Sequence, residues 1–378
     1  MNNHRILRRD LPGVSKPKDR MDLPPVSIII DNFNYGRFLT TAINSALGQT
    51  LSPIEVIVVD DGSTDQSREI IGSYGDRIRA IYKENGGQAS ALNAGFAASR
   101  GEIIIFLDSD DVLHANTAER VYKIYQDDTQ IAKINYRMEV IDENGRHIGM
   151  IKPPARLGIP SGDFSRRVLM FPGDIPWLPT SGNAFSRRGL KEIFPIPEED
   201  FRILADYYLN QVAPLFGAVA SIEQVGAYYR VHGSNAYENS GGTIQLSQIR
   251  KTIVHTQHVN KYLFAYAKKL GRSGTLRNPE EILSVSYVAN QLVSVKLDRE
   301  EHPMQKERFL QLLWEGFKAT LRRCDASLIT KCVYMIWFLS MFFAPKPAAQ
   351  FLAEIFYFPE KRHRLLNIGK VGIRREYG

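Results

Sequence analysis

The chain of 378 residues is 44% hydrophobic and 24% charged, the composition of a folded globular protein with a large buried core. Its two cysteines are too few for a disulfide framework and indicate a reducing compartment. The formal net charge of +7 comes mainly from Lys and Arg residues near the two ends. The central part is therefore not basic enough for a protein that binds duplex nucleic acid.

The first part of the chain alternates short apolar runs with amphipathic stretches. Residues 1–24 are polar and basic, which predicts a flexible tail rather than a signal peptide. We expect strands at Val26–Ile30, Ile54–Val59, Ile78–Tyr82 and Ile103–Leu107, and helices at Arg37–Leu47, Ser63–Ile71 and Ser90–Ala98. Strands that alternate with helices of about ten residues predict right-handed βαβ units and a parallel sheet.

Acidic residues follow three of these strands, at Asp31, at Asp60 and Asp61, and at Asp108–Asp111. Ligands of open α/β sheets bind outside the carboxyl ends of the strands, so we expect the acids to meet at one site. Carboxylate oxygens suit Mg²⁺ or Mn²⁺, and the chain carries neither a dinucleotide fingerprint nor a P-loop, so a metal is expected to handle any phosphates. The alternative for an isolated Asp-x-Asp-Asp is a solvated turn that caps the next helix.

The middle of the chain is less regular. We expect a helix at Asn116–Gln126 and a hairpin formed by Ile131–Asp142 and Ile148–Ile151. A Pro-rich loop contains Trp177 and leads into Ser181, Gly182 and Asn183. An aromatic ring beside small polar residues suits a sugar, whose faces stack on rings and whose hydroxyls need donors and acceptors. The alternative for Trp177 is core packing.

The last third of the chain predicts helices. Apolar stripes at helical spacing occur in Leu246–Leu270, Ile282–Leu297 and Phe309–Leu321. Residues Cys332–Ala344 are apolar on nearly all sides but are too few to cross a bilayer, which needs about 20 residues. This segment and the basic tail after it are expected to form a membrane-surface contact, a buried helix or a dimer contact.

Four motifs, in this order, resemble the family 2 glycosyltransferases of the GT-A fold, which are metal-dependent and inverting. They read VSIIIDNFNYGRFLTTAINSALGQT, IEVIVVDDGSTDQS, NGGQASALNAGFAASRGE and FLDSDD. The resemblance covers about residues 25–235 and implies an α/β fold of GT-A type, a mostly parallel sheet flanked by helices. The implied organisation is a tail at 1–24, a catalytic domain at 25–240 with a nucleotide-sugar half (25–112) and an acceptor half (113–240), and a helical region at 241–378.

The resemblance also assigns roles to individual residues. Asp110, together with Asp108, is expected to hold Mg²⁺ or Mn²⁺ on the donor diphosphate. The residues expected to contact the nucleotide sugar are Asp31, Phe33, Asp60, Asp61, Gly87, Asn93, Asp108, Arg230 and His232. The sequence departs from the family pattern where Asp31–Asn34 replaces a Pro-Thr pair and its following Tyr-Asn, and where Leu92 replaces an Arg. Both departures leave the choice of nucleotide open.

An inverting transfer needs one carboxylate that removes the proton of the acceptor hydroxyl. The stretch ILADYYLNQVAPLFG resembles the family's Glu-Asp helix start, with Ala205 in place of the Glu and Asp206 in place of the Asp. We expect Asp206 to be this base, with Glu198, Glu199 and Asp200 as rivals.

The function that the sequence predicts is sugar transfer from a nucleotide sugar, with a UDP-sugar as the expected donor, to a glycan or lipid-linked acceptor. The acceptor is expected to contact Trp177, Ser181, Gly182 and Asn183. We expect a cytoplasmic protein or one at the inner face of the membrane. The alternative is an inactive nucleotide-sugar-binding or scaffold protein of the same fold, because the Glu before Asp206 is missing.

Overall fold

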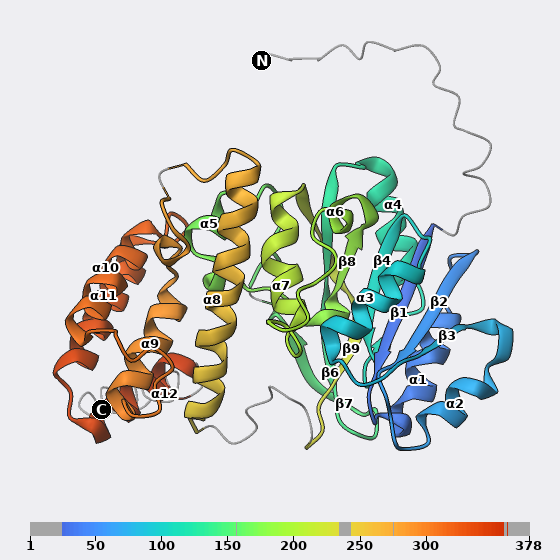
Figure 1. Cartoon of the computed structure of the whole chain (residues 1–378), viewed down its shortest axis with the longest axis horizontal. Coiled ribbons are helices and arrows are strands. Elements are labelled where there is room, and N and C mark those ends of the chain that lie inside the picture. Colours follow the sequence, from blue (N-terminus) through green and yellow to red (C-terminus); the bar gives the residue numbers. More distant parts are fainter. Residues whose placement is uncertain (1–24, 156, 234–242, 275, 359–360, 362–378) are drawn as a thin grey trace, which may run out of the picture.

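The computed structural model describes residues 25–155, 157–233, 243–274, 276–358 and 361. The expected tail at 1–24, the expected domain boundary at 240 and the basic residues after 361 lie outside the described residues. Figure 1 shows a sheet with covering helices in one part of the molecule and a group of helices, α8 to α12, at the other end.

One mixed sheet forms the first part of the molecule. Its strands in spatial order are β3 (Arg79–Tyr82), β2 (Ile54–Asp60), β1 (Val26–Asn32), β4 (Ile103–Asp108), β8 (Asn183–Ser186), β6 (Ile131–Ile141), β9 (Ala218–Arg230) and β5 (Val112–Leu113), and β7 (His147–Lys152) pairs with β6. The pairs from β3 to β4 are parallel, as is β6 with β9, whereas β8 is antiparallel to both of its neighbours. The predicted hairpin of β6 and β7 is confirmed.

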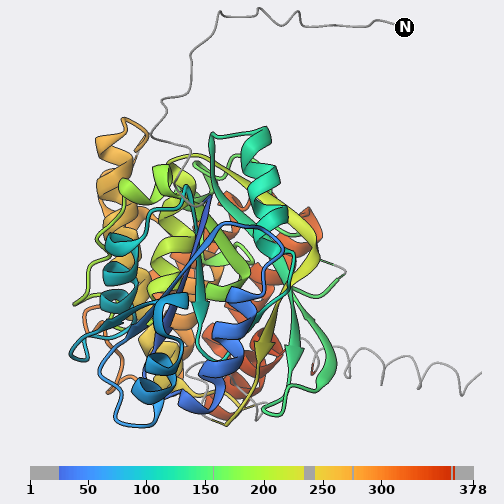
Figure 2. The same ribbon diagram turned by 90° about the vertical axis from the view of Figure 1, so that its right-hand side faces the viewer.

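Helices cover both faces of the parallel strands. The helices of this part are α1 (Gly36–Leu47), α2 (Ser67–Ser73), α3 (Gln88–Ala98), α4 (Thr117–Asp127), α5 (Arg167–Met170), α6 (Arg187–Lys191) and α7 (Ala205–Val212). Successive residues of a strand point to opposite faces. Thus Ile28 and Ile30 of β1 pack in the core formed with α1 and α4, and Ile29 packs in the core formed with α3 and α7. Figure 2 views this part from the side of the parallel strands.

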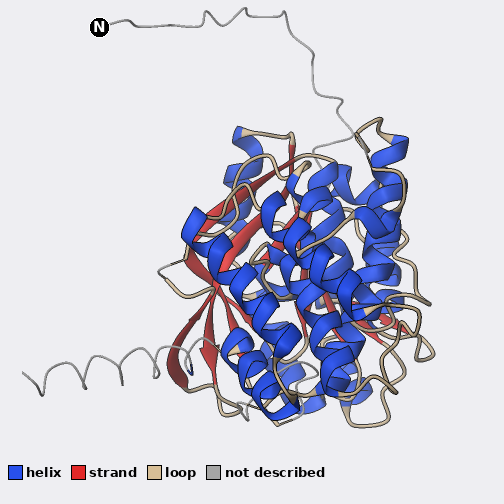
Figure 3. Ribbon diagram, turned by 90° about the vertical axis from the view of Figure 1, so that its left-hand side faces the viewer, coloured by secondary structure: helices blue, strands red, loops and turns tan. Residues whose placement is uncertain are grey.

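The last third is helical, as predicted. Its helices are α8 (Leu246–Lys269), α9 (Val285–Leu297), α10 (Phe309–Arg322), α11 (Leu328–Phe343) and α12 (Lys346–Tyr357). Helix α8 joins the two parts, since Val259 and Leu263 pack in the core beside the sheet, and Ile249 and Ile253 pack in the core of the other helices. Figure 3 shows these helices in front of the strands. None of the helices within the described ranges is both long enough and apolar enough to span a membrane.

Candidate active site

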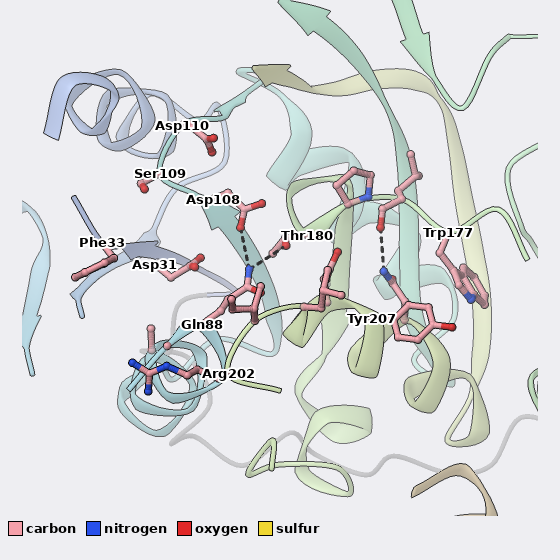
Figure 4. Close-up of a pocket in the computed structure, with 18 of the residues that line it drawn as sticks. Asp31, Phe33, Gln88, Asp108, Ser109, Asp110, Trp177, Thr180, Arg202 and Tyr207 are labelled. Atoms are coloured by element: carbon pink, nitrogen blue, oxygen red, sulfur yellow. Dashed lines mark hydrogen bonds between the residues drawn. The ribbon is translucent and has the colours of Figure 1, made fainter. Parts of the chain in front are cut away.

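The acids at the strand ends meet at one edge of the sheet, as the sequence predicts. Strands β1 and β4 are parallel neighbours in a register that pairs Asp31 with Asp108. A cleft of about 760 Å³ opens at this edge and is lined by both residues. In Figure 4, Asp31, Asp108 and Asp110 lie at one end of the cleft, Trp177 and Tyr207 at the other, and Gln88 and Thr180 between them. Its volume is in the range of small-molecule sites.

Asp61 organises the loop before α3. Its Oδ1 accepts hydrogen bonds from Gly86 N at 2.9 Å and from Lys83 Nζ at 2.7 Å, and its Oδ2 accepts one from Gly87 N at 2.7 Å. Gly87 has a φ of 87°, and a Cβ there would lie 2.4 Å from the carbonyl oxygen of Arg202. The loop thus requires glycine at this position. A carboxylate oxygen accepts two hydrogen bonds, so Oδ2 of Asp61 keeps one acceptor position for a ligand.

Asp60 lies behind the cleft rather than in its lining. Its carboxylate is fully buried and accepts hydrogen bonds from Asn32 Nδ2 at 3.2 Å and from Arg68 Nε at 3.0 Å. These contacts tie the end of β2 to β1 and α2. Asn93 also lies outside the lining, because its side-chain amide binds the backbone of Ile196 in both directions, at 2.9 and 2.7 Å. Phe33, in contrast, lines the cleft and is 44% exposed.

The carboxylates of the cleft are crowded. Burial, together with repulsion from Asp110 and Asp61, raises the pKa of Asp31 to about 7. Burial, together with repulsion from Asp31 and Asp111, also raises the pKa of Asp108 well above its usual range. Within the described part of the chain, Oδ1 of Asp31 is buried and has no hydrogen-bond partner. A group of this kind is stabilised by a cation or by strong donors from a ligand.

Asp110 is held by two residues of the Tyr-Arg-Val-His segment. His232 Nε2 lies 2.9 Å from Asp110 Oδ2, and Arg230 Nε donates to the backbone oxygen of Asp110 at 2.7 Å. The imidazole packs against the rings of Tyr35 and Phe38, with ring centroids 5.4 and 5.0 Å apart. Neither Arg230 nor His232 is part of the cleft lining, so in this structure they position Asp110.

The helix-cap alternative for the Asp108–Asp111 cluster is wrong. Helix α4 begins after Asn116, and no side chain caps it. Asp111 is buried instead, and its Oδ1 accepts a hydrogen bond from Arg230 N at 2.9 Å. The cluster therefore connects β4 to β9, at the other side of the sheet, and this connection holds the acids at the cleft.

The donor set of the cleft fits a divalent cation bound together with phosphates. The described residues contain no group of three or more His, Cys, Asp or Glu side chains arranged to hold a metal by themselves. However, Mg²⁺ is commonly bound by one or two carboxylates plus phosphate oxygens and waters. Asp110 and Asp108 supply such a pair, and the partnerless oxygen of Asp31 and the mutual repulsion of the acids favour a cation beside them.

Gln88 is a site residue that the sequence reasoning missed. Its Nε2 donates to Asp108 Oδ1 at 3.3 Å and lies 3.5 Å from Thr180 Oγ1, and its Oε1 accepts from Ala205 N at 3.0 Å. One side chain thus joins the end of the cleft that holds Asp108 to the start of α7 (Figure 4). The position of Gln88 at the end of the Asn-Gly-Gly loop was the available signal.

Asp206 lies in the first turn of α7 and lines the cleft. Burial raises the pKa of its carboxyl to about 6, while the Tyr207 backbone N–H and Lys133 lower it. The rivals Glu198, Glu199 and Asp200 are absent from the cleft lining. Asp200, for example, accepts a hydrogen bond from Tyr262 Oη at 2.7 Å, on α8.

A buried lysine lies beneath the end of the cleft that Trp177 lines. Lys133 of β6 is fully buried, and its Nζ donates to Asn210 Oδ1 and lies 3.8 Å from the centroid of a Trp177 ring. Burial lowers the pKa of Lys133 well below its usual value, whereas Asp206 raises it. Trp177 is fixed further by a hydrogen bond from its Nε1 to Gln211 Oε1 at 3.0 Å. The ring of Trp177 therefore lines the cleft in an orientation fixed by these contacts.

The other expected acceptor residues are buried behind the cleft. Ser181 Oγ accepts from Asp108 N at 3.0 Å, and Asn183 Nδ2 donates to the carbonyl of Pro179 at 2.6 Å. Gly182 packs against Leu178, leaving no room for a Cβ. These three residues shape the wall, and Thr180, which precedes them, is the member of the segment that lines the cleft.

The fold and the site define an α/β protein with a ligand cleft at the carboxyl ends of its parallel strands. The family model "Glycosyl transferase family 2" matches residues 27–194. An uncharacterized glycosyltransferase of Nostoc sp. is 34% identical over 251 residues, covering 65% of this chain and 76% of that protein. One of Rickettsia prowazekii is 39% identical over 149 residues, 39% of this chain and about half (47%) of that relative. The chain belongs to glycosyl transferase family 2 and is a glycosyltransferase.

Solved structures share the fold at low sequence identity. The crystal structure of S. aureus TarS 1-349 has a TM-score of 0.52 and 15% identity, and covers 89% of this chain and 92% of that one. The same protein in complex with UDP-GlcNAc gives a TM-score of 0.51 at 15% identity, covering 88% and 91%. The mixed α/β sheet with flanking helices, followed by a helical region, is therefore a fold that this chain shares with TarS.

Proposed function

We propose that the protein transfers a sugar, with inversion, from a UDP-sugar to a glycan or lipid-linked acceptor. The observation that carries this proposal is that carboxylates at three strand ends (Asp31, Asp61, and Asp108 with Asp110) and the carboxylate of Asp206 line the same cleft. The UDP-GlcNAc complex of TarS, which shares the fold, supports a uridine diphosphate donor. The unpaired cysteines support a cytoplasmic site of action.

The donor occupies the end of the cleft formed by residues 25–112. Asp31 and Phe33 contact the base, and the spare acceptor position of Asp61 receives a ribose hydroxyl. Asp110 and Asp108 would hold Mg²⁺ or Mn²⁺, which would neutralise charge on the departing diphosphate. His232 and Arg230 keep Asp110 in place.

The acceptor occupies the end formed by residues 113–240. The hydroxyl oxygen of the acceptor attacks the anomeric carbon of the sugar, the bond from that carbon to the diphosphate breaks, and the hydroxyl proton passes to Asp206. A carboxylate with a pKa of about 6 is ionised at neutral pH and more basic than a solvated one, as a general base requires. The fixed ring of Trp177 provides a face for the acceptor sugar.

Thermal stabilisation by a panel of nucleotide sugars, with and without Mn²⁺, tests the donor. We expect UDP-sugars with Mn²⁺ to raise the melting temperature and GDP-, CDP- and TDP-sugars to leave it unchanged. Stabilisation by another nucleotide alone would overturn the choice of UDP.

A second measurement tests the base and separates an active enzyme from an inactive binding protein. Asp206→Asn should keep the affinity for the UDP-sugar but lower UDP release by roughly a hundredfold or more, the usual contribution of a positioned general base. If the unaltered protein binds a UDP-sugar but releases no UDP with any acceptor, the inactive alternative is favoured. Full activity of Asp206→Asn would move the base to another residue.

A further inference from the structure

Helices α10 and α11 carry large apolar side chains on their outer surface. Ile329 and Phe343 are each 78% exposed, and Ile336 is 62% exposed. We define the outer apolar face by Leu310, Trp314, Leu321, Ile329, Ile336 and Phe343. Large exposed apolar side chains gathered on two helices that pack against each other mark a surface that something else covers.

The spacing of these residues makes them stripes rather than scattered side chains. Ile329, Ile336 and Phe343 recur every seven residues of α11, and Leu310 and Trp314 are four apart on α10, so each set lies along one side of its helix. The opposite sides are buried: Phe338 of α11 packs where a Cβ at Gly316 of α10 would lie. Both stripes therefore point away from the core of the helical region. Helices α10 and α11 themselves lie at the end of the molecule opposite the parallel strands (Figure 1).

The charge around the outer apolar face is positive. Residues 309–357, which span α10 to α12, contain five Lys or Arg and three acids. Glu315 is half-buried, and Asp325 and Glu354 are paired with Arg323 and Lys361 at 2.7 Å each, whereas Lys318 and Lys346 are exposed. Residues 362–378 hold five Lys or Arg and one Glu in the sequence, and they lie outside the described residues.

This charge favours an anionic lipid surface over a second copy of the chain. A twofold contact through the outer apolar face would bring Lys318 and Lys346 toward the same lysines of the other copy, with few acids to pair them. An anionic bilayer offers opposite charge to every lysine and an apolar layer to the stripes. Helix α11 has 16 residues, too few to span a bilayer but enough to lie in its interface.

We propose that the outer apolar face of α10 and α11 docks the protein on an anionic lipid bilayer. The docking helices are firmly joined to the acceptor end of the cleft, because Asp174 accepts hydrogen bonds from Val285 N and Ser286 N of α9, at 2.8 Å each, and pairs with Arg323 at 3.2 Å. Under the proposed function, on which this last step rests, docking favours a lipid-linked acceptor.

Vesicle flotation of the full chain without any substrate tests the docking surface independently of catalysis. The probe is vesicles of phosphatidylcholine and phosphatidylglycerol in equal parts, compared with phosphatidylcholine alone. We expect at least about tenfold tighter binding to the anionic vesicles, and weakening by salt, because several basic residues border the face. Equal binding to both vesicle types, or none, would overturn the proposal.

Surface substitutions locate the contact. The triple variant Ile329→Ser/Ile336→Ser/Phe343→Ser should bind anionic vesicles roughly a hundredfold less tightly, because three apolar anchors are lost. The control is Ile148→Ser/Met150→Ser on β7, whose side chains are 46% and 52% exposed and should not matter. Both variants should melt at the wild-type temperature. Undiminished binding by a folded triple variant would contradict the proposal.

An environment-sensitive fluorophore on Cys332 identifies what covers the face. Cys332 is exposed on α11, and Cys324→Ser removes the other cysteine of the chain. We expect an aqueous emission spectrum for the free protein and a blue shift on addition of anionic vesicles. A blue shift without vesicles overturns the proposal: if it grows with protein concentration, a second copy covers the face, and if it is independent of concentration, a segment of the same chain does.

Deletion of the carboxyl-terminal helices is not a suitable test. Trp337, Phe338 and Met341 of α11 are buried against α9, α10 and α12, so removing them would expose the core of the helical region. Loss of solubility after such a deletion would report unfolding rather than docking.

Discussion

Asp206 carries a proton equilibrium that a pH profile can measure. Burial raises its pKa to about 6, so below this pH the carboxyl is protonated and cannot accept the proton of the acceptor. We expect the transfer rate to rise by about tenfold per pH unit on the acid side and to level off above pH 6, because only the ionised form is active. A metal-saturated assay of UDP release checks this. The rise of the rate with pH on the acid side is the acid limb of the profile. If the residual activity of Asp206→Asn kept this acid limb, a group other than Asp206 would be responsible for it.

Lys133 should set the position of that acid limb. Its charge favours the ionised form of Asp206, so Lys133→Met should raise the pKa of Asp206, shift the limb to higher pH and reduce the rate severalfold at neutral pH. The matched control is Lys123→Met on the exposed side of α4. An unchanged limb would show that Lys133 is uncharged and acts only by holding Asn210 and Trp177.

Asp110 should determine the metal dependence of donor binding. Calorimetric titration of the UDP-sugar into Asp110→Ala should show no gain in affinity on addition of Mn²⁺, whereas the unaltered protein should gain roughly tenfold or more from charge neutralisation at the diphosphate. Asp76→Ala, at an exposed acid of the same half, serves as the control. A persistent effect of Mn²⁺ in Asp110→Ala would place the cation elsewhere.

At the scale of elements, the loop before α3 depends on a glycine whose replacement has a clear cost. Gly87→Ala places a methyl group against the backbone of Arg202 at a φ of 87°, so we expect the free energy of unfolding to fall by about 2 kcal/mol or more and donor affinity to fall with it. Gly72→Ala, inside α2 with open space around it, should instead stabilise by about 0.5–1 kcal/mol. Equal stability of the two variants would mean that the loop adapts without cost.

The elements that sequence predicts best are those specified locally. Strands β1, β2 and β4 are runs of buried Ile and Val, and their acidic ends fall in the cleft because parallel strands end at one edge. The role of Asp111 could not be predicted, because its partner Arg230 is 119 residues away and the contact exists only once β9 joins the sheet. The same holds for Lys133, which reads as one polar residue of a strand until α7 and the Trp177 loop pack over it.

Helix α11 is an element whose environment the sequence could not predict. Its composition suggested a helix that is apolar on nearly all sides, with a buried position, a dimer contact and a membrane surface as alternatives. The structure buries Trp337, Phe338 and Met341 and leaves the opposite side exposed. An apolar residue in a sequence does not specify whether its contact is within the chain or outside it, and only the packing of α10 against α11 distinguishes the two.

At the scale of the whole molecule, Asp174 connects the cleft to the helical region. Asp174 ends the short 3-10 helix Pro172–Asp174, just before Trp177. Its buried carboxylate caps the amino terminus of α9 and pairs with Arg323. Charged acceptors at a helix amino terminus stabilise it through the unpaired N–H groups and the helix dipole. Asp174 therefore links the end of the cleft near Trp177 to the proposed bilayer-docking helices.

Asp174→Ala should weaken that link. Two N–H groups of α9 and the guanidinium of Arg323 lose a charged acceptor, so we expect the free energy of unfolding to fall by about 2–3 kcal/mol. Acceptor KM should rise while donor affinity stays constant, because the donor end of the cleft lies on β1, β2 and β4. The control, Asp163→Ala, removes an exposed carboxylate that accepts a hydrogen bond from the nearby Ser165 N, and it should change neither quantity by much. Chemical denaturation and steady-state kinetics measure both effects, and loss of donor affinity in Asp174→Ala would show that the two ends of the cleft are coupled through the sheet as well.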